Sequence, residues 1–376
     1  WAVLLMAGVA AAWWWRVEPA RALMVAVAVL VVTCPCALSL ATPAAMLAAA
    51  GNLARRGVLV RELQGLEALS SVDTVIFDKT GTLTRDGQRI ERTQVASGVR
   101  PEQALAWAAS LATHSLHPLS RALVAAHEAQ AKGASSGPAL NGAVIERVGQ
   151  GLEMQDAQGH MWRLGSWSFG HEWAPDIPVD AAQAQVHLVR KGQWLGSWTF
   201  SEDVREDARE TVDRLRAAGV QVQILSGDRP QAVIHVAQQL GIDQAQGGCS
   251  PQDKLRVLQQ AQQQGHKVAM VGDGLNDGPV LAGAHVSIAL GQAVPLTQSN
   301  ADLVLMGNRL LSVAEAFALS QKTLHVVRQN LWWAAFYNAV CVPLAWAGLL
   351  PPWLAGLGMA LSSLLVVMNA LRLSRS

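Results

Sequence analysis

The feature that most restricts the fold is a long apolar stretch, residues 22–53, that carries no charged residue. Inside a bilayer the backbone must satisfy its own polar groups, so an apolar stretch of this kind can cross only as a helix. One crossing needs about 20 apolar residues, and this stretch is longer, so we expect a span with a break or a tail. Residues 331–350 and 353–371 each have the length of one crossing, with a short Pro351-Pro352 hairpin between them.

Aromatic and basic residues flank these runs as in a membrane protein. Residues 1–15 are apolar but short, and we expect them to be the remainder of a truncated crossing that ends in an interfacial belt of Trp13, Trp14, Trp15 and Arg16. The positive-inside rule places the intervening soluble part on the cytoplasmic side. The basic residues that support this orientation are Arg55, Arg56, Arg61, Lys322 and Arg328.

The composition agrees with a membrane protein that carries a soluble portion. The 376 residues are 51% hydrophobic and 15% charged, with a net charge of +1. This near-neutral charge argues against a nucleic-acid-binding protein. Cys34 and Cys36 lie inside the long apolar run, which argues against a secreted disulfide framework.

The most informative motif of the soluble part is Asp78-Lys79-Thr80-Gly81-Thr82, which follows a short apolar strand at residues 74–77. Ligands of open α/β sheets bind beyond the carboxyl ends of the strands. A carboxylate beside a lysine and two hydroxyls on a glycine turn is a candidate nucleophile toward phosphate.

Three later segments supply partners for this chemistry. Ser226 and Asp228 follow a second apolar strand, and the Ser226 hydroxyl can hold a phosphoryl oxygen. Lys254 can offset negative charge in the transition state. Asp273 and Asp277 lie four residues apart on a glycine turn after a third strand, with Asn276 beside them. Oxygen ligands of this kind suit Mg²⁺.

In this order the motifs resemble the haloacid dehalogenase type of phosphotransfer domain, and the first motif makes the set similar to a P-type ATPase. Phosphatases of that superfamily carry a second aspartate two residues after the nucleophile, where this chain has Thr80. The resemblance implies Mg²⁺ held by Asp78, the Thr80 carbonyl and Asp273. It also implies an actuator domain with a Thr-Gly-Glu loop, and no Thr-Gly-Glu occurs in the chain.

The segment at residues 85–201 interrupts the phosphotransfer motifs and is the candidate ATP-binding insert. A helix-like stretch at 102–130 precedes strand-like pieces at 143–145, 161–164, 186–189 and 194–200. Resemblance to the nucleotide-binding domain of heavy-metal P-type ATPases implies nucleotide contacts from His117, Gly149, Gly151 and Gly165. The chain departs from that family at Ala112, Leu116 and Ser166, so His114 is an alternative polar contact.

A Cys34-Pro35-Cys36 sequence interrupts the long apolar run. Proline breaks a helix, and two thiolates form a soft site suited to Cu(I), and less specifically to Zn²⁺ or Cd²⁺. The set resembles the Cu(I)-transporting P1B-type ATPases, which implies further ligands in the last two crossings. These candidate residues are Tyr337, Asn338, Met359 and Ser363.

We therefore predict a multidomain membrane protein with transmembrane α-helices, a haloacid dehalogenase-like α/β phosphorylation domain and an inserted α+β nucleotide-binding domain. The predicted parts are membrane segments at 1–56 and 324–376, the phosphorylation domain at 57–84 and 202–323, and the nucleotide-binding domain at 85–201. The resemblance implies ATP-driven Cu(I) transport out of the cytosol, with ATP and Mg²⁺ as cofactors.

It also implies a bacterial inner membrane, a lipid bilayer around the helices, a cytosolic copper donor protein, and actuator and metal-binding domains elsewhere in the polypeptide. Other soft metals such as Ag(I), Zn²⁺ or Cd²⁺ remain alternatives. A membrane-tethered phosphatase is a further alternative, which Thr80 disfavours. A non-catalytic copper-binding protein is another, which the complete phosphotransfer set disfavours.

Overall fold

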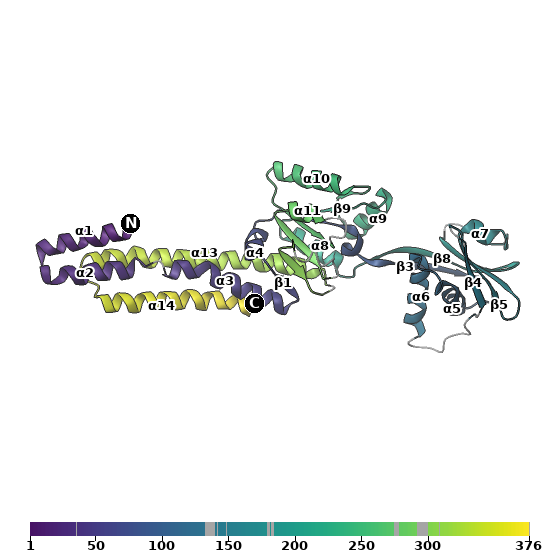
Figure 1. Ribbon diagram of the computed structural model, residues 1–376, viewed down its shortest axis with the longest axis horizontal. Helices are drawn as coiled ribbons and strands as arrows, with labels where there is room; N and C mark the ends of the chain where they lie inside the picture. Colours follow the sequence, from purple (N-terminus) through teal and green to yellow (C-terminus); the bar gives the residue numbers. More distant parts are fainter. Residues whose placement is uncertain are drawn as a thin grey trace. The chain divides into compact units, whose positions relative to one another are not determined.

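The computed structural model describes residues 1–34, 36–131, 140, 142–147, 149–178, 181, 184–273, 278–291, 300–307 and 309–375. The chain divides into two compact units (Figure 1). The first unit comprises Trp1–Leu83 and Glu206–Ser376, and the second comprises Thr84–Arg205.

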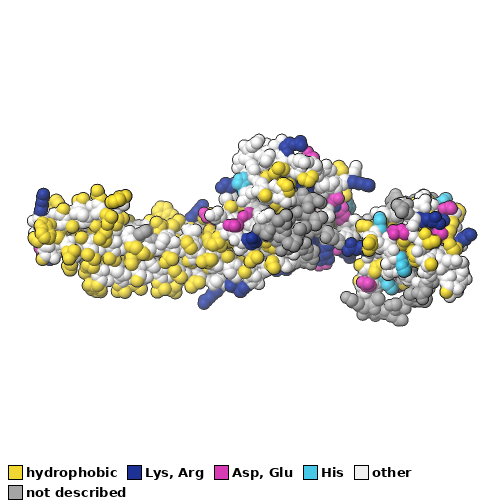
Figure 2. All heavy atoms as spheres, in the orientation of Figure 1, with side chains coloured by type: hydrophobic (Ala, Val, Ile, Leu, Met, Phe, Trp, Pro, Cys, Tyr) yellow, Lys and Arg dark blue, Asp and Glu magenta, His cyan; other side chains and the backbone are white. Residues whose placement is uncertain are grey.

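The first unit contains a helical part and a sheet. The helices of the helical part are α1 (Ala2–Val17), α2 (Pro19–Val32), α3 (Cys36–Arg55), α13 (Leu311–Trp346) and α14 (Pro352–Leu371), followed by a short turn η3 (Arg372–Ser374). Figure 1 shows these helices lying alongside one another, and Figure 2 shows that hydrophobic side chains cover the visible face of this part. Pro19–Arg55 and Pro352–Ser374 are long and apolar enough to cross a membrane.

The helical part contains the break that was expected in the long apolar run. It corrects the bounds of the crossing predicted at 331–350. The long apolar run forms α2 and α3 with an interruption between Val32 and Cys36, as predicted. The crossing predicted at 331–350 is the second half of α13, which starts twenty residues earlier and ends at Trp346. The prediction missed this continuity because the first half of α13 mixes polar and apolar residues.

The sheet of the first unit has seven strands in the order β1-β13-β12-β11-β2-β9-β10. All neighbouring strands are parallel except β1 and β13. The strands are β1 (Val58–Val60), β2 (Thr74–Phe77), β9 (Gln221–Leu225), β10 (Gln244–Gln246), β11 (Val268–Gly272), β12 (Val286–Leu290) and β13 (Leu303–Leu305). The accompanying helices are α4 (Leu63–Leu69), α8 (Ala208–Ala217), α9 (Pro230–Leu240), α10 (Pro251–Gln263) and α11 (Gly278–Gly283).

The central strands of this sheet explain where the site forms. Every residue of β2, β11 and β12 is buried, as expected for parallel strands covered on both faces. β2 lies between β9 and β11 and is parallel to both. The carboxyl ends of these three strands therefore meet at one edge, and the segments that follow them are adjacent in space.

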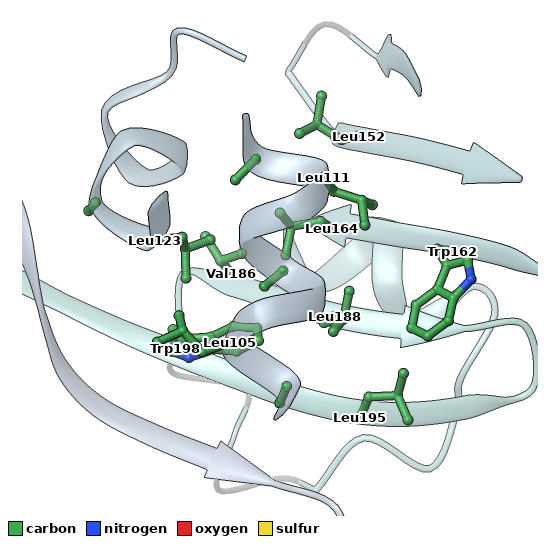
Figure 3. Packing of buried hydrophobic residues seen from close by; sticks show 14 of the residues in the cluster. Leu105, Leu111, Leu123, Leu152, Trp162, Leu164, Val186, Leu188, Leu195 and Trp198 are labelled. Atoms are coloured by element: carbon green, nitrogen blue, oxygen red, sulfur yellow. The ribbon is translucent and has the colours of Figure 1, made fainter. Parts of the chain in front are cut away.

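The second unit is a six-stranded antiparallel sheet in the order β3-β8-β7-β6-β5-β4. Its core contains apolar side chains from the sheet and from two helices, including Leu105, Leu111, Leu188 and Trp198 (Figure 3). The strands are β3 (Thr84–Val95), β4 (Gly142–Arg147), β5 (Gly151–Asp156), β6 (Met161–Gly165), β7 (Val186–Arg190) and β8 (Gln193–Val204). The helices are α5 (Pro101–Ala112), α6 (Pro118–Ala131) and α7 (Trp167–His171).

The structure confirms the four predicted strand pieces of this unit and corrects its helix. The single helical stretch expected at 102–130 is two helices, α5 and α6, with a break before Pro118. Proline disfavours helical backbone in the residue that precedes it, so the chain turns there. Strands β3 and β5 were not predicted, because β3 is largely polar and β5 mixes acidic and apolar residues.

Candidate functional site

Asp78 directly follows β2 and is buried, with 7% of its surface exposed. Its backbone N–H donates to the Val271 carbonyl of β11 at 2.9 Å, which fixes the chain at this point. Lys254 Nζ donates to Asp78 Oδ1 at 2.7 Å. Lys254 lies in the first turn of α10, which begins with a capping box between Ser250 and Asp253. The carboxylate is thus positioned by two strands and one capped helix.

A second carboxylate, Asp228, lies at the same sheet edge and binds the motif that follows Asp78. Lys79 Nζ lies 2.7 Å from Asp228 Oδ2, and Thr80 Oγ1 donates to the same oxygen at 2.6 Å. Ser226 Oγ donates to it at 3.3 Å, and the Asp228 N–H donates to Ser226 Oγ at 3.1 Å. Partial burial by itself raises the pKa of Asp228, but the hydrogen bonds and charge of Lys79 and the Thr80 bond hold that pKa below its ordinary value.

The predicted Mg²⁺ ligands lie close to one another around the turn η1 (Lys79–Leu83). Gly81 has a φ of +73°, and a Cβ at Gly81 would lie 2.7 Å from Asp273 Oδ2. The turn after β2 and the carboxylate after β11 therefore approach so closely that a side chain at Gly81 would displace one of them. Asn276 and Asp277 lie outside the described residues.

The oxygen atoms near Gly81 are of the chemical type that Mg²⁺ prefers as ligands. The carboxylates of Asp78 and Asp273 and the Thr80 carbonyl are hard ligands, and Mg²⁺ usually takes one or two carboxylates and completes its shell with water and phosphate. Within the described part of the chain, no three His, Cys, Asp or Glu residues gather into a metal site by themselves. A site here accordingly depends on the backbone carbonyl and on substrate oxygens as well.

The four residues predicted to contact nucleotide line one cavity in the second unit. The cavity has a volume of about 280 Å³, and His117, Gly149, Gly151 and Gly165 are among its lining residues. His114, which the structure describes, is not among them. The geometry therefore gathers the segment before α6 and the ends of β4, β5 and β6 around one space.

The close approach of β5 and β6 explains the glycines of this cavity. A Cβ at Gly151 would lie 2.2 Å from the Leu164 carbonyl oxygen, and one at Gly165 would lie 2.2 Å from that of Gln150. Neither position has room for a side chain, so both glycines keep the backbone exposed to the cavity.

Two charged residues of the cavity were not predicted from the sequence, Glu146 and Arg147 at the end of β4. Ser115 Oγ donates to Glu146 Oε1 at 2.9 Å, and the His117 N–H donates to Ser115 Oγ at 3.2 Å. These bonds link the carboxylate to the segment that carries His117. Thirty-one residues separate Ser115 from Glu146, so no local pattern in the sequence indicates their contact.

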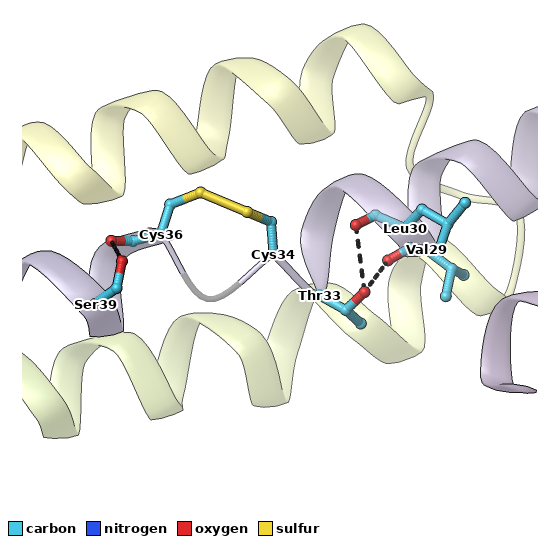
Figure 4. The surroundings of a disulfide bond; sticks show 6 residues. All are labelled: Val29, Leu30, Thr33, Cys34, Cys36 and Ser39. Atoms are coloured by element: carbon cyan, nitrogen blue, oxygen red, sulfur yellow. Dashed lines mark hydrogen bonds between the residues drawn. A yellow bond between two sulfur atoms is a disulfide. The ribbon is translucent and has the colours of Figure 1, made fainter. Parts of the chain in front are cut away.

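The break between α2 and α3 carries Cys34 and Cys36, which the structure joins as a disulfide with their Cα atoms 5.5 Å apart (Figure 4). This differs from the two thiolates expected from the sequence, so a metal would bind the reduced form of the pair. Thr33 Oγ1 donates to the Val29 carbonyl at 2.7 Å, which helps to end α2. Pro35 lies outside the described residues.

The other predicted metal ligands lie on the two helices that pack against α3. Ala37 and Ala41 of α3 share an apolar cluster with Ala334 of α13 and Val366 of α14. On α13, Tyr337 follows Ala334 by one helical turn, and Asn338 is the next residue. On α14, Ser363 precedes Val366 by one turn, and Met359 precedes Ser363 by a further turn. All four are partly buried.

Tyr337 lies against α14. Its hydroxyl donates to the Ala355 carbonyl at 3.4 Å, and a Cβ at Gly358 would lie 2.9 Å from its Oη. The polar contacts between α13 and α14 include one more that the sequence analysis did not predict: Trp333 Nε1 donates to the buried Ser362 Oγ at 3.1 Å.

Comparison with known proteins agrees with this architecture. Residues 72–285 match the haloacid dehalogenase-like hydrolase family. The chain is 42% identical over 356 residues to the nitrogen fixation protein FixI of Rhizobium leguminosarum bv. viciae, covering 94% of this chain and 45% of FixI. It is 40% identical over 369 residues to the probable copper-exporting P-type ATPase V of Mycobacterium tuberculosis, covering 95% of this chain and 47% of that protein.

Among solved structures, a zinc-transporting PIB-type ATPase in its E2.Pi state is similar to the whole chain. The TM-score is 0.82 at 30% identity, over 100% of this chain and 62% of that structure. The chain spans about half the length of the curated relatives described above. The predicted fold class is confirmed: this chain belongs to the haloacid dehalogenase-like hydrolase family, and its homologues and structural neighbours include heavy-metal P-type ATPases.

Proposed function

We propose that the complete protein couples ATP hydrolysis to Cu(I) transport out of the cytosol of a bacterium, across the inner membrane, through an aspartyl phosphate on Asp78. The observation that carries the proposal is the pairing of two features in one unit. A buried carboxylate lies at the sheet edge beside Lys254, and a Cys34–Cys36 pair lies at a break between apolar helices. A cytosolic copper donor protein is the expected partner.

In the proposed reaction an Asp78 carboxylate oxygen attacks the γ-phosphorus of ATP in line. The new O–P bond forms as the bond from the γ-phosphorus to the β,γ-bridging oxygen breaks, and ADP leaves with that electron pair. Lys254 holds Asp78 and offsets the charge that develops on the phosphoryl oxygens. When bound by Asp78, the Thr80 carbonyl and Asp273, Mg²⁺ would supply further neutralisation of phosphate charge.

Thr80 favours a pump over a simple phosphatase. Its hydroxyl donates to Asp228 instead of offering an acidic group beside Asp78. Hydrolysis of the aspartyl phosphate therefore requires a group from another part of the protein, and the intermediate persists long enough to drive a conformational change.

The proposal of Cu(I) as the transported substrate rests on the chemistry of the membrane helices. Thiolate and thioether ligands, here Cys34, Cys36 and Met359, suit Cu(I). Neither the 331–350 nor the 353–371 segment contains Asp, Glu, Lys or Arg, so the charge of a divalent ion would be poorly compensated there. The similarity to a zinc-transporting structure makes Zn²⁺ the second candidate.

The metal assignment is tested by ATPase activity of the full-length protein under reducing conditions. We expect stimulation by Cu(I) and Ag(I), little stimulation by Zn²⁺, and loss of stimulation in Cys34→Ser and Cys36→Ser. Cys249→Ser is the matched control, because Cys249 is buried in the soluble part of the unit. Strong stimulation by Zn²⁺ with none by Cu(I) would overturn the copper assignment and leave the P-type mechanism intact.

The phosphorylation step is tested separately with γ-labelled ATP. Asp78→Asn should abolish the acid-stable, hydroxylamine-sensitive label, because the amide cannot act as the nucleophile. Asp73→Asn is the control, since Asp73 precedes the same strand at its opposite end. Undiminished labelling of Asp78→Asn would refute the role of Asp78.

A further inference from the structure

A second cavity of about 460 Å³ lies between α13 and the end of α14, where the apolar helices reach the soluble part of the first unit. Lys322, His325 and Gln329 of α13 line it together with Arg372 at the end of α14. Among the described residues that line the cavity there is no carboxylate. Figure 2 shows Lys and Arg side chains gathered where the hydrophobic helical part meets the larger body of the unit.

A hydrogen-bonded chain holds the polar side chains of this cavity in place. Gln329 Nε2 lies 3.0 Å from His325 Nε2, and Asn369 Nδ2 donates to Gln329 Oε1 at 3.2 Å. Arg372 Nη1 donates to Asn369 Oδ1 at 3.1 Å. The Arg372 guanidinium, just past the end of α14, is therefore oriented by Asn369 of α14, which in turn bonds Gln329 of α13. The cavity is rich in donors.

Among the described residues, no ion pair joins the cations of the cavity to an acid of its own helices. Glu315 is the only carboxylate in the sequence of α13, and its Oε1 pairs with Arg309 Nη2 at 3.2 Å. The sequence of α14 has none. The ion pairs of the described residues include neither Lys322 nor Arg372. An anion is the ligand that complements this charge.

Exposed apolar side chains continue from the cavity toward the centre of the apolar helices. On α13, Trp332 and Phe336 follow Gln329 by one and two turns and are 77% and 62% exposed. On α14, Met368 and Leu365 precede Arg372 by one and two turns and are 57% and 51% exposed. Each helix thus carries a cation or a hydrogen-bond donor at the cavity. The exposed apolar side chains just named form an apolar ridge that continues from the cavity toward the centre of each helix.

We propose that this cavity binds the phosphate of an anionic phospholipid, with the acyl chains along the apolar ridges of α13 and α14. Basic pockets between transmembrane helices at the membrane surface recognise anionic headgroups. A free phosphate would use the cations but not the ridges, whereas a phospholipid satisfies both. The proposal concerns a site distinct from the phosphorylation and metal sites, and it stands whether the transported ion is Cu(I) or Zn²⁺.

The test measures lipid retention by the full-length protein in detergent micelles that contain phosphatidylglycerol or phosphatidylcholine, using native mass spectrometry. Wild type should retain phosphatidylglycerol preferentially. The double variant Lys322→Gln/Arg372→Gln should bind it at least about tenfold more weakly, since each cation near the surface contributes to anionic lipid binding. Its retention of phosphatidylcholine should not change.

Arg328→Gln is the matched control, because Arg328 is an exposed cation of the same helix that does not line the cavity. It should leave phosphatidylglycerol retention within about twofold of wild type, because one cation outside a pocket adds only a general surface attraction. Unchanged aspartyl phosphate formation in the double variant and in Arg328→Gln will show that both are folded.

Three results would overturn the proposal. The first is equal loss of phosphatidylglycerol in Arg328→Gln and in the double variant, which indicates a general surface charge. The second is displacement of the lipid by millimolar inorganic phosphate or glycerol 3-phosphate, which indicates a site for a soluble anion. The third is no retained phosphatidylglycerol in the wild-type protein, which indicates that another part of the full-length chain occupies the cavity.

Discussion

At the scale of single residues, two lysines at one sheet edge bind different carboxylates. Lys254 binds the proposed nucleophile Asp78. Lys79, which follows Asp78 in the chain, binds Asp228 instead. Lys79 therefore ties the motif after β2 to the segment after β9. We infer that Lys79 and Asp228 position the motif, while Lys254 acts on the carboxylate and the phosphoryl group directly.

The Asp228 contact predicts a dependence of stability on pH. Its pKa in the folded protein lies below the ordinary value of 3.8. The charged form is thus favoured by folding, and its stabilisation is complete above that value and is lost as the pH falls through the folded-state pKa. Asp228→Asn should lower the thermal unfolding midpoint at pH 6, and the difference from wild type should shrink as the pH falls below about 4.

The measurement is thermal unfolding of wild type and Asp228→Asn across pH 3–7. Asp243→Asn is the control, because the Asp243 side chain is 90% exposed and its partner Arg216 lies at the surface. A constant difference between wild type and Asp228→Asn over the whole range would contradict the expectation.

The cavity of the second unit predicts a second effect of single residues. His117→Ala should weaken ATP binding by about 1 kcal/mol, the size of one neutral hydrogen bond or stacking contact. Calorimetric titration with ATP provides the measurement. His114→Ala is the control, since His114 does not line the cavity. A larger loss in His114→Ala than in His117→Ala would move the adenine contact to His114.

At the scale of elements, the turn after β2 is the most constrained connection. Gly81 adopts a φ of +73°, and a Cβ there would lie 2.7 Å from Asp273 Oδ2. Gly219 also has a positive φ, +82°, but a Cβ there would meet no atom within 4 Å. The two positions share the backbone conformation and differ in the neighbouring carboxylate.

This comparison predicts that Gly81→Ala and Gly219→Ala both lose about 1 kcal/mol of stability from backbone strain, and that only Gly81→Ala impairs phosphorylation. In Gly81→Ala the methyl group must push Asp273 aside, so the Mg²⁺ concentration needed for half-maximal phosphoenzyme formation should rise. Equal Mg²⁺ dependence in the two variants would show that Asp273 does not act through the metal.

At the scale of the whole molecule, the second unit has its own core and its own sheet. We expect a fragment of residues 84–205 to fold alone and to bind ATP. Leu188 is fully buried in the core cluster (Figure 3), so Leu188→Ala should lower the free energy of unfolding of the fragment by about 2–5 kcal/mol. Leu116 is 92% exposed, so Leu116→Ala should change it by less than about 0.5 kcal/mol.

Urea unfolding of the fragment followed by tryptophan fluorescence provides the measurement. A fragment that shows no cooperative transition would contradict the independence of this unit. Similar losses in Leu188→Ala and Leu116→Ala would contradict the assignment of the core.

The sequence by itself determined the features that depend on short-range chemistry. Apolar length predicted the membrane helices, proline predicted the break between α2 and α3, and strand-end polar motifs placed Asp78, Ser226 and Asp273 at one sheet edge. The tertiary structure decided the features that join distant segments: the Lys79–Asp228 ion pair, the contact of Ser115 with Glu146, and the cavity that His325 and Arg372 share. Hydrophobic periodicity and segment length are local properties of the sequence, so they determine which helices and strands form. The contacts between distant segments depend instead on how the sheets and helices pack.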